Sequence, residues 1–426
     1  MFRRFFFGLD DDIELNVDEG SVLVRTNTSD TISDEYKNLR NELKRTIGLT
    51  DNQSFNARLK NRELNGKTNC FASLIHPFLP SNKNLVYSGE HQIFCGSFTK
   101  DGSEFISASQ DRYVRVFDSR NWKIKERIRA LEFGWSILDF DSSETHIAYG
   151  TWSSNICFHT KGESDVTQRL LPLLDDDGYQ SGIFSLSFSP DEKYILAGGH
   201  TRLIFIYDLE AEHSTPILAH DNDVNAVKWL GSTGNLMLSG SDDGMIKLWD
   251  KRDSRRCQYS FIGNLDGITN IDCMENGIYF LSNSKDQSIR LWDIRKNTDP
   301  MDAIPPPESY WDYRYGDSSL GNNGRELRSG KYAHKLDNSI HSFRGHCVGR
   351  TLIRAKFSPM NTTGQRYIYC GSAQLPFSVY IYDIITGKLE KRLDGHNGLI
   401  RDLSWNPNYP QIVSVGWDGD IIAWDC

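Results

Sequence analysis

Apolar and polar residues alternate in short runs along most of this chain, and Gly, Asn, Pro and Asp separate the runs. This alternation is typical of β-strands that are joined by tight turns. Seven of the runs end in Trp-Asp or in a variant of it: Trp249-Asp250, Trp292-Asp293, Trp424-Asp425, Phe117-Asp118, Tyr207-Asp208, Tyr382-Asp383 and the degraded Phe158-His159. The endpoints lie about 42 to 49 residues apart, except for one gap of about twice that length after Asp293.

This spacing is that of a four-stranded propeller blade, so the chain is predicted to be all-β, a seven-bladed WD-repeat β-propeller over 83–426. The first four blades are expected at 94–120, 135–159, 183–208 and 224–252, and the last three begin at Ile268, Leu352 and Leu399. The last blade reaches only its third strand before Cys426. We therefore expect 84–88 to supply the fourth strand and close the ring.

The last blade also holds a set of polar residues with the spacing of a hydrogen-bonded tetrad, namely His396, Ser414, Asp418 and Trp424. A buried imidazole and carboxylate must satisfy each other, and an indole N–H needs an acceptor. Asp111, Asp243 and Asp286 hold the place of Asp418 in other blades. Because the arrangement recurs, we interpret it as structural rather than as a catalytic His-Asp pair.

Two regions lie outside the predicted blades. Residues 1–82 form an N-terminal extension, expected to be partly disordered, with a helix at about 33–47 capped by Ser33 and a second possible helix at 55–64. The first helix is amphipathic, with one apolar face formed by Tyr36, Leu39, Leu43 and Ile47. That face either packs against the propeller rim or docks into a groove of a partner.

The second region, 296–338, explains the long gap as an insertion within the fifth blade rather than an eighth repeat. It is rich in Pro, Gly and charged residues, and it is placed between the third and fourth strands of that blade. Loops of this length in a compact domain are usually functional or disordered. Its Trp311-Asp312-Tyr313-Arg314 segment is not a strand end and is not counted as a blade.

Composition narrows the classes of partner. A net charge of -9 with a pI near 5.7 gives no sign of a phosphate-binding surface, so direct nucleic-acid binding is not expected. No apolar run approaches the length of a membrane span. The eight cysteines include no Cys-x-x-Cys pair, which fits reduced thiols in the cytoplasm or nucleus. No spacing typical of a catalytic nucleophile, phosphate-binding loop, cofactor or metal site is present.

Three of the Trp-Asp-type endings are followed by an arginine two residues after the Asp: Arg120, Arg252 and Arg295. Arg252 and Arg295 belong to consecutive blades and should lie side by side on one rim. An arginine there offers a planar fork for carboxylate or carbonyl groups. The alternative is a solvated rim residue that contributes little.

These Trp-Asp-x-Arg boxes resemble those of the substrate receptors of cullin-4 ubiquitin ligases. Further segments are similar to the WD-repeat-containing protein 23 type of receptor, namely 94–96, 100–102, 223–227, 282–286, 311–314, 351–354 and 417–419. The resemblance covers the propeller with its insertion and fades before about Phe78. Among the departures from the pattern, Cys157-Phe158-His159 lacks the Trp-Asp pair and Tyr382-Asp383-Ile384-Ile385 lacks the arginine.

The resemblance implies a non-catalytic receptor that bridges an adaptor, damage-specific DNA-binding protein 1, and through it cullin-4, to a protein substrate. Such a receptor raises the concentration of target lysines near a conjugating enzyme. The residues it implies for adaptor binding are Arg252, Arg295, Arg120, Asp250 and Asp293. On the opposite face, Trp135, Arg350, Arg354 and Arg401 are candidate substrate contacts.

These arginines suggest an acidic degron, and relatives of this type are associated with turnover of a basic-leucine-zipper stress-response factor. The expected location is the nucleus and the cytoplasm. The main alternative is a non-catalytic WD-repeat scaffold of another complex. A propeller enzyme is a more distant alternative, because the residues expected to line the central channel form no metal or carboxylate cluster.

Overall fold

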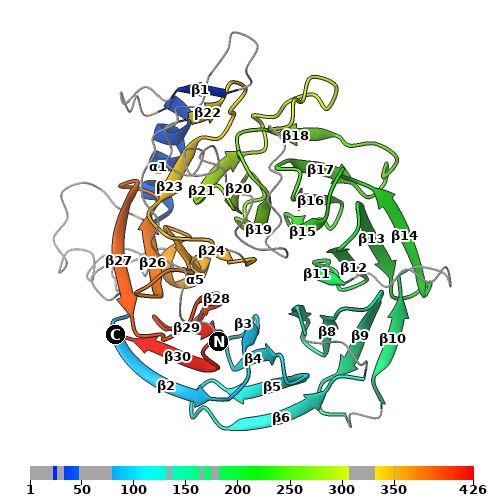
Figure 1. The fold of residues 1–426 in the computed structure, drawn as a ribbon, viewed down its shortest axis with the longest axis vertical. Helices are drawn as coiled ribbons and strands as arrows, with labels where there is room; N and C mark the ends of the chain where they lie inside the picture. Colours follow the sequence, from blue (N-terminus) through cyan, green and yellow to red (C-terminus); the bar gives the residue numbers. More distant parts are fainter. Residues whose placement is uncertain are drawn as a thin grey trace, which may run out of the picture.

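The structure is a computed structural model that describes residues 23–25, 33–47, 79–131, 137–163, 167–173, 182–306, 332–349 and 351–426. Seven antiparallel sheets of four strands stand around a central axis, so the seven-bladed propeller is confirmed (Figure 1). None of the described cysteines forms a disulfide. In the part of the chain that is described, no helix is long and apolar enough to cross a membrane.

Each blade is a meander of strands a, b, c and d, counted outwards from the axis. Blades 1 to 3 are β3 (Ile93–Phe98), β4 (Glu104–Ser109), β5 (Tyr113–Asp118), β6 (Ile124–Arg129); β7 (Asp139–Ser142), β8 (His146–Gly150), β9 (Asn155–Thr160), β10 (Arg169–Pro172); and β11 (Ile183–Phe188), β12 (Tyr194–Gly199), β13 (Leu203–Asp208), β14 (His213–Leu218). Blades 4 and 5 are β15 (Val224–Leu230), β16 (Leu236–Ser241), β17 (Ile246–Asp250), β18 (Tyr259–Phe261); and β19 (Ile268–Cys273), β20 (Tyr279–Ser284), β21 (Ser288–Asp293), β23 (His341–Arg344). Blade 6 is β24 (Ala355–Phe357), β25 (Tyr367–Cys370), β26 (Ser378–Asp383) and β27 (Lys388–Asp394), with the short helix α5 (Met360–Thr363) between its first two strands.

Blade 7 closes the ring with strands from both ends of the described propeller. Its strands are β28 (Ile400–Trp405), β29 (Ile412–Gly416), β30 (Asp420–Asp425) and, as the outer strand, β2 (Asn82–Ser88). The register runs from Asn82 opposite Asp425 to Ser88 opposite Asp420. The closing strand therefore has the place that its sequence position predicts, and it begins two residues earlier than expected.

The blades pack face to face through apolar side chains that alternate along the strands. Between blades 4 and 5, for example, Leu248 and Phe261 lie in one buried cluster with Ile268, Phe280 and Trp292. Burial of such side chains stabilises each blade only in the presence of its neighbour. The core is therefore a ring of seven interfaces rather than one central cluster.

The inner strands have an unpaired edge that faces the axis, and side chains of the preceding blade cover part of it. Asp402 of blade 7 accepts a hydrogen bond from the backbone N–H of Gly96 in blade 1, at 3.1 Å. Asp139 of blade 2 does the same for Leu186 in blade 3, at 2.9 Å. An unpaired buried N–H is costly, so these contacts replace the missing strand partner.

The N-terminal extension contributes a strand and a helix to the described structure. Strand β1 (Leu23–Arg25) pairs antiparallel with β22 (Tyr332–His334), which lies in the chain segment between β21 and β23. Helix α1 (Asp34–Ile47) begins after Ser33, whose Oγ accepts a hydrogen bond from the N–H of Tyr36, at 3.2 Å. The possible helix at 55–64 and the Trp311-Asp312-Tyr313-Arg314 segment lie outside the described residues.

Candidate partner-binding surfaces

The meander of each blade defines two faces of the ring. Loops that join strands a to b and c to d emerge on one face, here called the c–d face. Loops that join b to c, and those that lead from one blade to the next, emerge on the other, the b–c face. The segment between β21 and β23, which contains the predicted insertion, is a c–d connection and shares the face of Arg252 and Arg295.

Arg252 lies just after β17 and turns back onto the Asp of its own Trp-Asp pair. Its Nε donates to Asp250 Oδ1 at 3.0 Å, and its Nη2 donates to Asp250 Oδ2 at 2.6 Å. The hydrogen bond from Arg252 lowers the pKa of Asp250. The arginine side chain is nevertheless 70% exposed, so the outer donors of a fixed guanidinium point to solvent.

Arg295 repeats this geometry in the neighbouring blade. Its Nε lies 2.9 Å from Asp293 Oδ1 and its Nη2 lies 2.7 Å from Asp293 Oδ2, while the side chain stays 63% exposed. The same Nη2 also donates to the Tyr279 hydroxyl at 3.1 Å. Blades 4 and 5 thus present two arginines in one fixed conformation on the same face.

Arg120 is exposed on the c–d face as well, but it belongs to blade 1 and not to this pair. Its backbone N–H donates to Asp118 Oδ1 at 2.9 Å, as the N–H of Arg252 and Arg295 does to Asp250 and Asp293. The structure therefore brings two of the three predicted arginines into neighbouring blades and leaves the third several blades away.

Helix α1 packs on the ring between blades 5 and 6 (Figure 1), where its side chains join a cluster from both blades. Its apolar side chains Tyr36, Leu39 and Leu43 are at most 6% exposed, within a cluster from both blades. The apolar face therefore packs on the propeller, as the first of the two interpretations expects. It is not available for a partner's groove.

Two polar contacts join this helix to the arginine box of blade 5. Glu42 Oε2 accepts from the Tyr279 hydroxyl at 3.3 Å, and that hydroxyl also accepts from Arg295. Glu35 forms an ion pair with Lys296 at 2.8 Å, which lowers the pKa of Glu35. Sequence reasoning missed Tyr279, because a tyrosine at a strand start gives no signal of its contact with a distant arginine.

The predicted tetrad of blade 7 is joined by hydrogen bonds. His396 Nδ1 lies 2.9 Å from Asp418 Oδ2, His396 Nε2 lies 2.8 Å from Ser414 Oγ, and the indole N–H of Trp424 donates to the same Oγ at 2.8 Å. His396 and Trp424 are at most 5% exposed. The imidazole is thus satisfied on both sides within the blade, which fits the structural interpretation.

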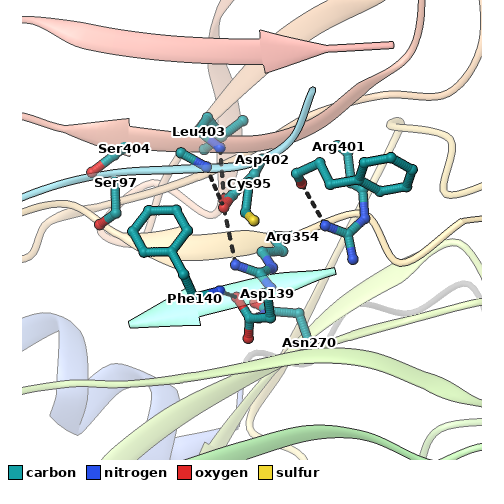
Figure 2. A network of polar contacts seen from close by, with 12 residues as sticks. Cys95, Ser97, Asp139, Phe140, Asn270, Arg354, Arg401, Asp402, Leu403 and Ser404 are labelled. Atoms are coloured by element: carbon teal, nitrogen blue, oxygen red, sulfur yellow. Dashed lines mark hydrogen bonds and ion pairs between the residues drawn. The ribbon is translucent and has the colours of Figure 1, made fainter. Parts of the chain in front are cut away.

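Two of the predicted substrate contacts, Arg354 and Arg401, occupy the centre of the ring instead of its surface (Figure 2). The Arg354 guanidinium forms ion pairs with Asp139 of blade 2 at 2.5 Å and with Asp402 of blade 7 at 3.0 Å. The Arg401 guanidinium donates to the carbonyls of Phe94 and Leu138. This corrects the expectation, because Arg401 is buried, the Arg354 side chain is only 12% exposed, and the donors of both hold the ring together.

Buried apolar side chains also meet across the centre. Leu138 of blade 2, Phe184 of blade 3 and Leu352 of blade 6 form one cluster, and each lies at or just before the start of an inner strand. They therefore bridge the ring opening on the b–c side. The other two substrate-face candidates, Trp135 and Arg350, lie outside the described residues.

Comparison with known protein families supports the WD repeats that the sequence predicts. The model described as "WD domain, G-beta repeat" matches residues 81–118, 172–208, 212–250, 255–293 and 387–425. The first match combines β2 with the first three strands of blade 1. None of the five matches covers the first three strands of blade 2 or of blade 6.

Similarity to curated proteins covers most of the chain. It is 38% identical to the LEC14B protein of Lithospermum erythrorhizon, over 78% of this chain and 72% of that protein. It is 33% identical to the DDB1- and CUL4-associated factor 11 homolog of Caenorhabditis elegans, over 91% of this chain and 71% of that protein. A homolog of the same name from Caenorhabditis briggsae is 31% identical over 91% of the chain. With these identities and this coverage, the chain belongs to the WD-repeat family that contains the LEC14B proteins and the DDB1- and CUL4-associated factor 11 homologs.

Proposed function

We propose that this protein is a substrate receptor of a cullin-4 ubiquitin ligase, which binds the adaptor damage-specific DNA-binding protein 1 through its c–d face and holds a target protein on its b–c face. The observation that carries the proposal is the pair of Trp-Asp-x-Arg boxes in blades 4 and 5. Two relatives are named for an association with the adaptor and cullin-4, which supports the same assignment.

The geometry of the two boxes suits a binding role. Each guanidinium is held by the carboxylate of its own Trp-Asp pair, so little side-chain freedom remains to be lost on binding. Each is also more than half exposed, so donors remain for carboxylate or carbonyl groups of the adaptor. Asp250 and Asp293 act as positioning residues in this arrangement. Arg120 lies on the same face but in blade 1, away from these two boxes.

Helix α1 enlarges this surface at blade 5. Its polar side carries the exposed residues Lys37, Asn38 and Asn41, and its Glu35 pairs with Lys296, next to Arg295. An adaptor that covers both arginine boxes therefore also meets the helix. The connection between β21 and β23 begins and ends on this face, and it contains the predicted insertion.

Within this class we assign the chain to the WD-repeat-containing protein 23 type, on the segments quoted above. A basic-leucine-zipper stress-response factor is the substrate that this type implies, with action in the nucleus and cytoplasm. The chain itself supplies no catalytic step in this proposal and acts by proximity. The alternative is a WD-repeat scaffold of another complex. In that case the two arginine boxes would not bind the adaptor.

The experiment is adaptor binding by an Arg252→Ala, Arg295→Ala double variant. Loss of two central arginines from an interface is expected to cost about 2 kcal/mol or more, or about 30-fold in Kd. An Arg252→Lys variant keeps the charge but removes the planar fork, so an intermediate loss is expected. Affinity is measured by surface plasmon resonance with purified adaptor.

An exposed arginine on the other face, Arg202, provides the control. The Arg202→Ala variant should bind the adaptor like the wild type. All variants should keep the wild-type melting temperature, because the replaced side chains are exposed. Equal adaptor affinity of the double variant and the wild type would refute the role of the boxes, and no adaptor binding by the wild type would favour the scaffold.

A further inference from the structure

The hydroxyl of Tyr279 links helix α1 to the arginine box of blade 5. Arg295 Nη2 donates to this hydroxyl at 3.1 Å, and the hydroxyl donates to Glu42 Oε2 at 3.3 Å. The hydroxyl thus uses its single donor towards the helix and an acceptor lone pair towards the arginine. The two hydrogen bonds form one directed chain from α1 to Arg295.

The position of this hydroxyl is fixed by burial. Tyr279 is only 2% exposed, and its ring lies in the buried cluster that also holds Tyr36, Leu39 and Leu43 of α1. A close-packed ring has little freedom to move. Burial, together with the charge of Glu42, raises the pKa of Tyr279, so the hydroxyl keeps its proton at neutral pH.

Tyr279 adds a further contact to a guanidinium that Asp293 already holds. Asp293 accepts from Nε of Arg295 at 2.9 Å and from Nη2 at 2.7 Å. The remaining Nη2 hydrogen goes to Tyr279, so the whole Nε–Nη2 edge is occupied. Within the described residues Nη1 makes no hydrogen bond, and its two donors are left for the adaptor.

The arginine box of blade 4 lacks this contact. Leu236 stands opposite Asp250 as Tyr279 stands opposite Asp293, and a leucine side chain has no hydrogen-bonding group. In the described part of the chain, the Arg252 guanidinium is hydrogen-bonded to Asp250 alone. The two boxes therefore differ in how firmly the guanidinium is held, and the difference lies in the residue that contacts α1.

An ion pair ties the helix to the same box at a second point. Glu35 pairs with Lys296, the residue after Arg295, at 2.8 Å. Glu35 and Glu42 are seven residues apart, about two helical turns, so they lie on one side of α1. Because this ion pair is partly exposed, it contributes little by itself. The contact through Tyr279 is the one that acts on the guanidinium.

We infer that Tyr279 is a positioning residue for adaptor binding, and that helix α1, by holding its hydroxyl, keeps Arg295 in the conformation that the adaptor binds. This inference rests on the proposed function and adds a regulation to it, because the N-terminal extension then controls the affinity of blade 5 for the adaptor. A guanidinium that is already fixed loses less freedom on binding. By linkage, the bound adaptor in turn stabilises the docked helix.

The test is a double-mutant cycle in the full chain, with the affinity for purified adaptor measured by surface plasmon resonance. Tyr279→Phe keeps the ring in the buried cluster and removes only the hydroxyl. It should weaken adaptor binding about threefold to tenfold, both in the wild-type chain and in an Arg252→Ala variant. In an Arg295→Ala variant it should have no further effect, because the side chain that it positions is absent.

Tyr194→Phe is the matched control. Tyr194 stands opposite Asp208 of blade 3 in the same register position as Tyr279, but no arginine lies two residues after this Asp. The control variant should bind the adaptor like the wild type. Melting temperatures measured in parallel show that each variant is folded.

The helix end of the chain of contacts is tested at Glu42. Glu42→Ala should weaken adaptor binding about twofold or more, and Glu42→Gln, which keeps an acceptor for the hydroxyl, should lose less. Both losses should disappear in a Tyr279→Phe chain, whereas a direct contact between Glu42 and the adaptor would persist there and overturn the role of the helix.

An equal effect of Tyr279→Phe in chains with and without Arg295 would overturn the inference, since the hydroxyl would then act by another route. Unchanged affinity of the Tyr279→Phe chain would overturn it as well. Either result leaves the receptor proposal intact if the Arg252→Ala, Arg295→Ala double variant has lost adaptor binding. No adaptor binding by the wild type would instead overturn the receptor proposal, and this inference with it.

Discussion

Single arginines in this protein differ in role because their surroundings differ. Arg252 and Arg295 are held by the Asp of their own Trp-Asp pairs and are exposed, whereas the Arg354 side chain is only 12% exposed and spans the ring between Asp139 and Asp402. A buried ion pair that loses one partner leaves an uncompensated charge, so Arg354 is a structural residue. Arg252 and Arg295 carry no such cost, because their side chains are exposed. In the proposed function they bind the adaptor.

His346, which precedes blade 6, is expected to make the free energy of unfolding depend on pH. His346 is buried, and burial lowers its pKa to about 4 from the ordinary 6.5. The unfolded chain therefore binds a proton between pH 6.5 and 4 that the folded chain does not. The free energy of unfolding should fall as the pH decreases through this window, by about 1.4 kcal/mol per pH unit at most.

The check is urea unfolding of the wild type and of a His346→Gln variant at pH 7 and pH 5. The variant should lose less stability between the two values, whatever its stability at pH 7. His146 and His334, whose pKa values burial also lowers, contribute equally to both proteins. Equal losses in the two proteins would mean that His346 does not remain neutral on folding.

Helix α1 is the element that joins the N-terminal extension to the ring. Its apolar positions at spacings of three and four predict the helix, and the Ser33 cap marks its start. The pattern does not say what the apolar face packs against. In the structure it lies on blades 5 and 6 and reaches Arg295 through Glu42 and Tyr279.

We predict that a Leu39→Asp variant releases α1 while the ring stays folded. Leu39 is 1% exposed, and truncation of such a side chain alone costs about 2 to 5 kcal/mol, so a charge there exceeds what one helix can tolerate. Hydrogen exchange of the amides of 34–47 should become fast, and that of the inner strands should stay slow. Asn38→Asp, on the exposed side of the same helix, should leave both unchanged.

The sequence predicts the positions of the strands and blades better than it predicts which side chains are buried. The Trp-Asp endings and their spacing correctly predict seven blades and the closing strand. They do not show that Arg354 and Arg401 are buried, because this depends on carboxylates and carbonyls of blades far away in sequence, such as Asp139 and Leu138.

The whole molecule depends on one strand pairing that joins its two ends. Removal of residues 1–88 deletes α1 and β2, and removal of 1–78 deletes α1 but keeps β2. We expect the longer truncation to lose about 5 kcal/mol more than the shorter one, because six paired residues of the closing strand lose their ladder. Thermal unfolding of both truncations measures the difference, and similar melting temperatures would show that the ring holds without β2.

This closure also has a consequence for how the protein is made. Asn82 donates to the carbonyl of Cys426, 344 residues later, so blade 7 is complete only after Cys426 has left the ribosome. At about 5 to 20 residues per second, β2 waits on the order of half a minute with an open edge. Synthesis of the last strand therefore completes the ring.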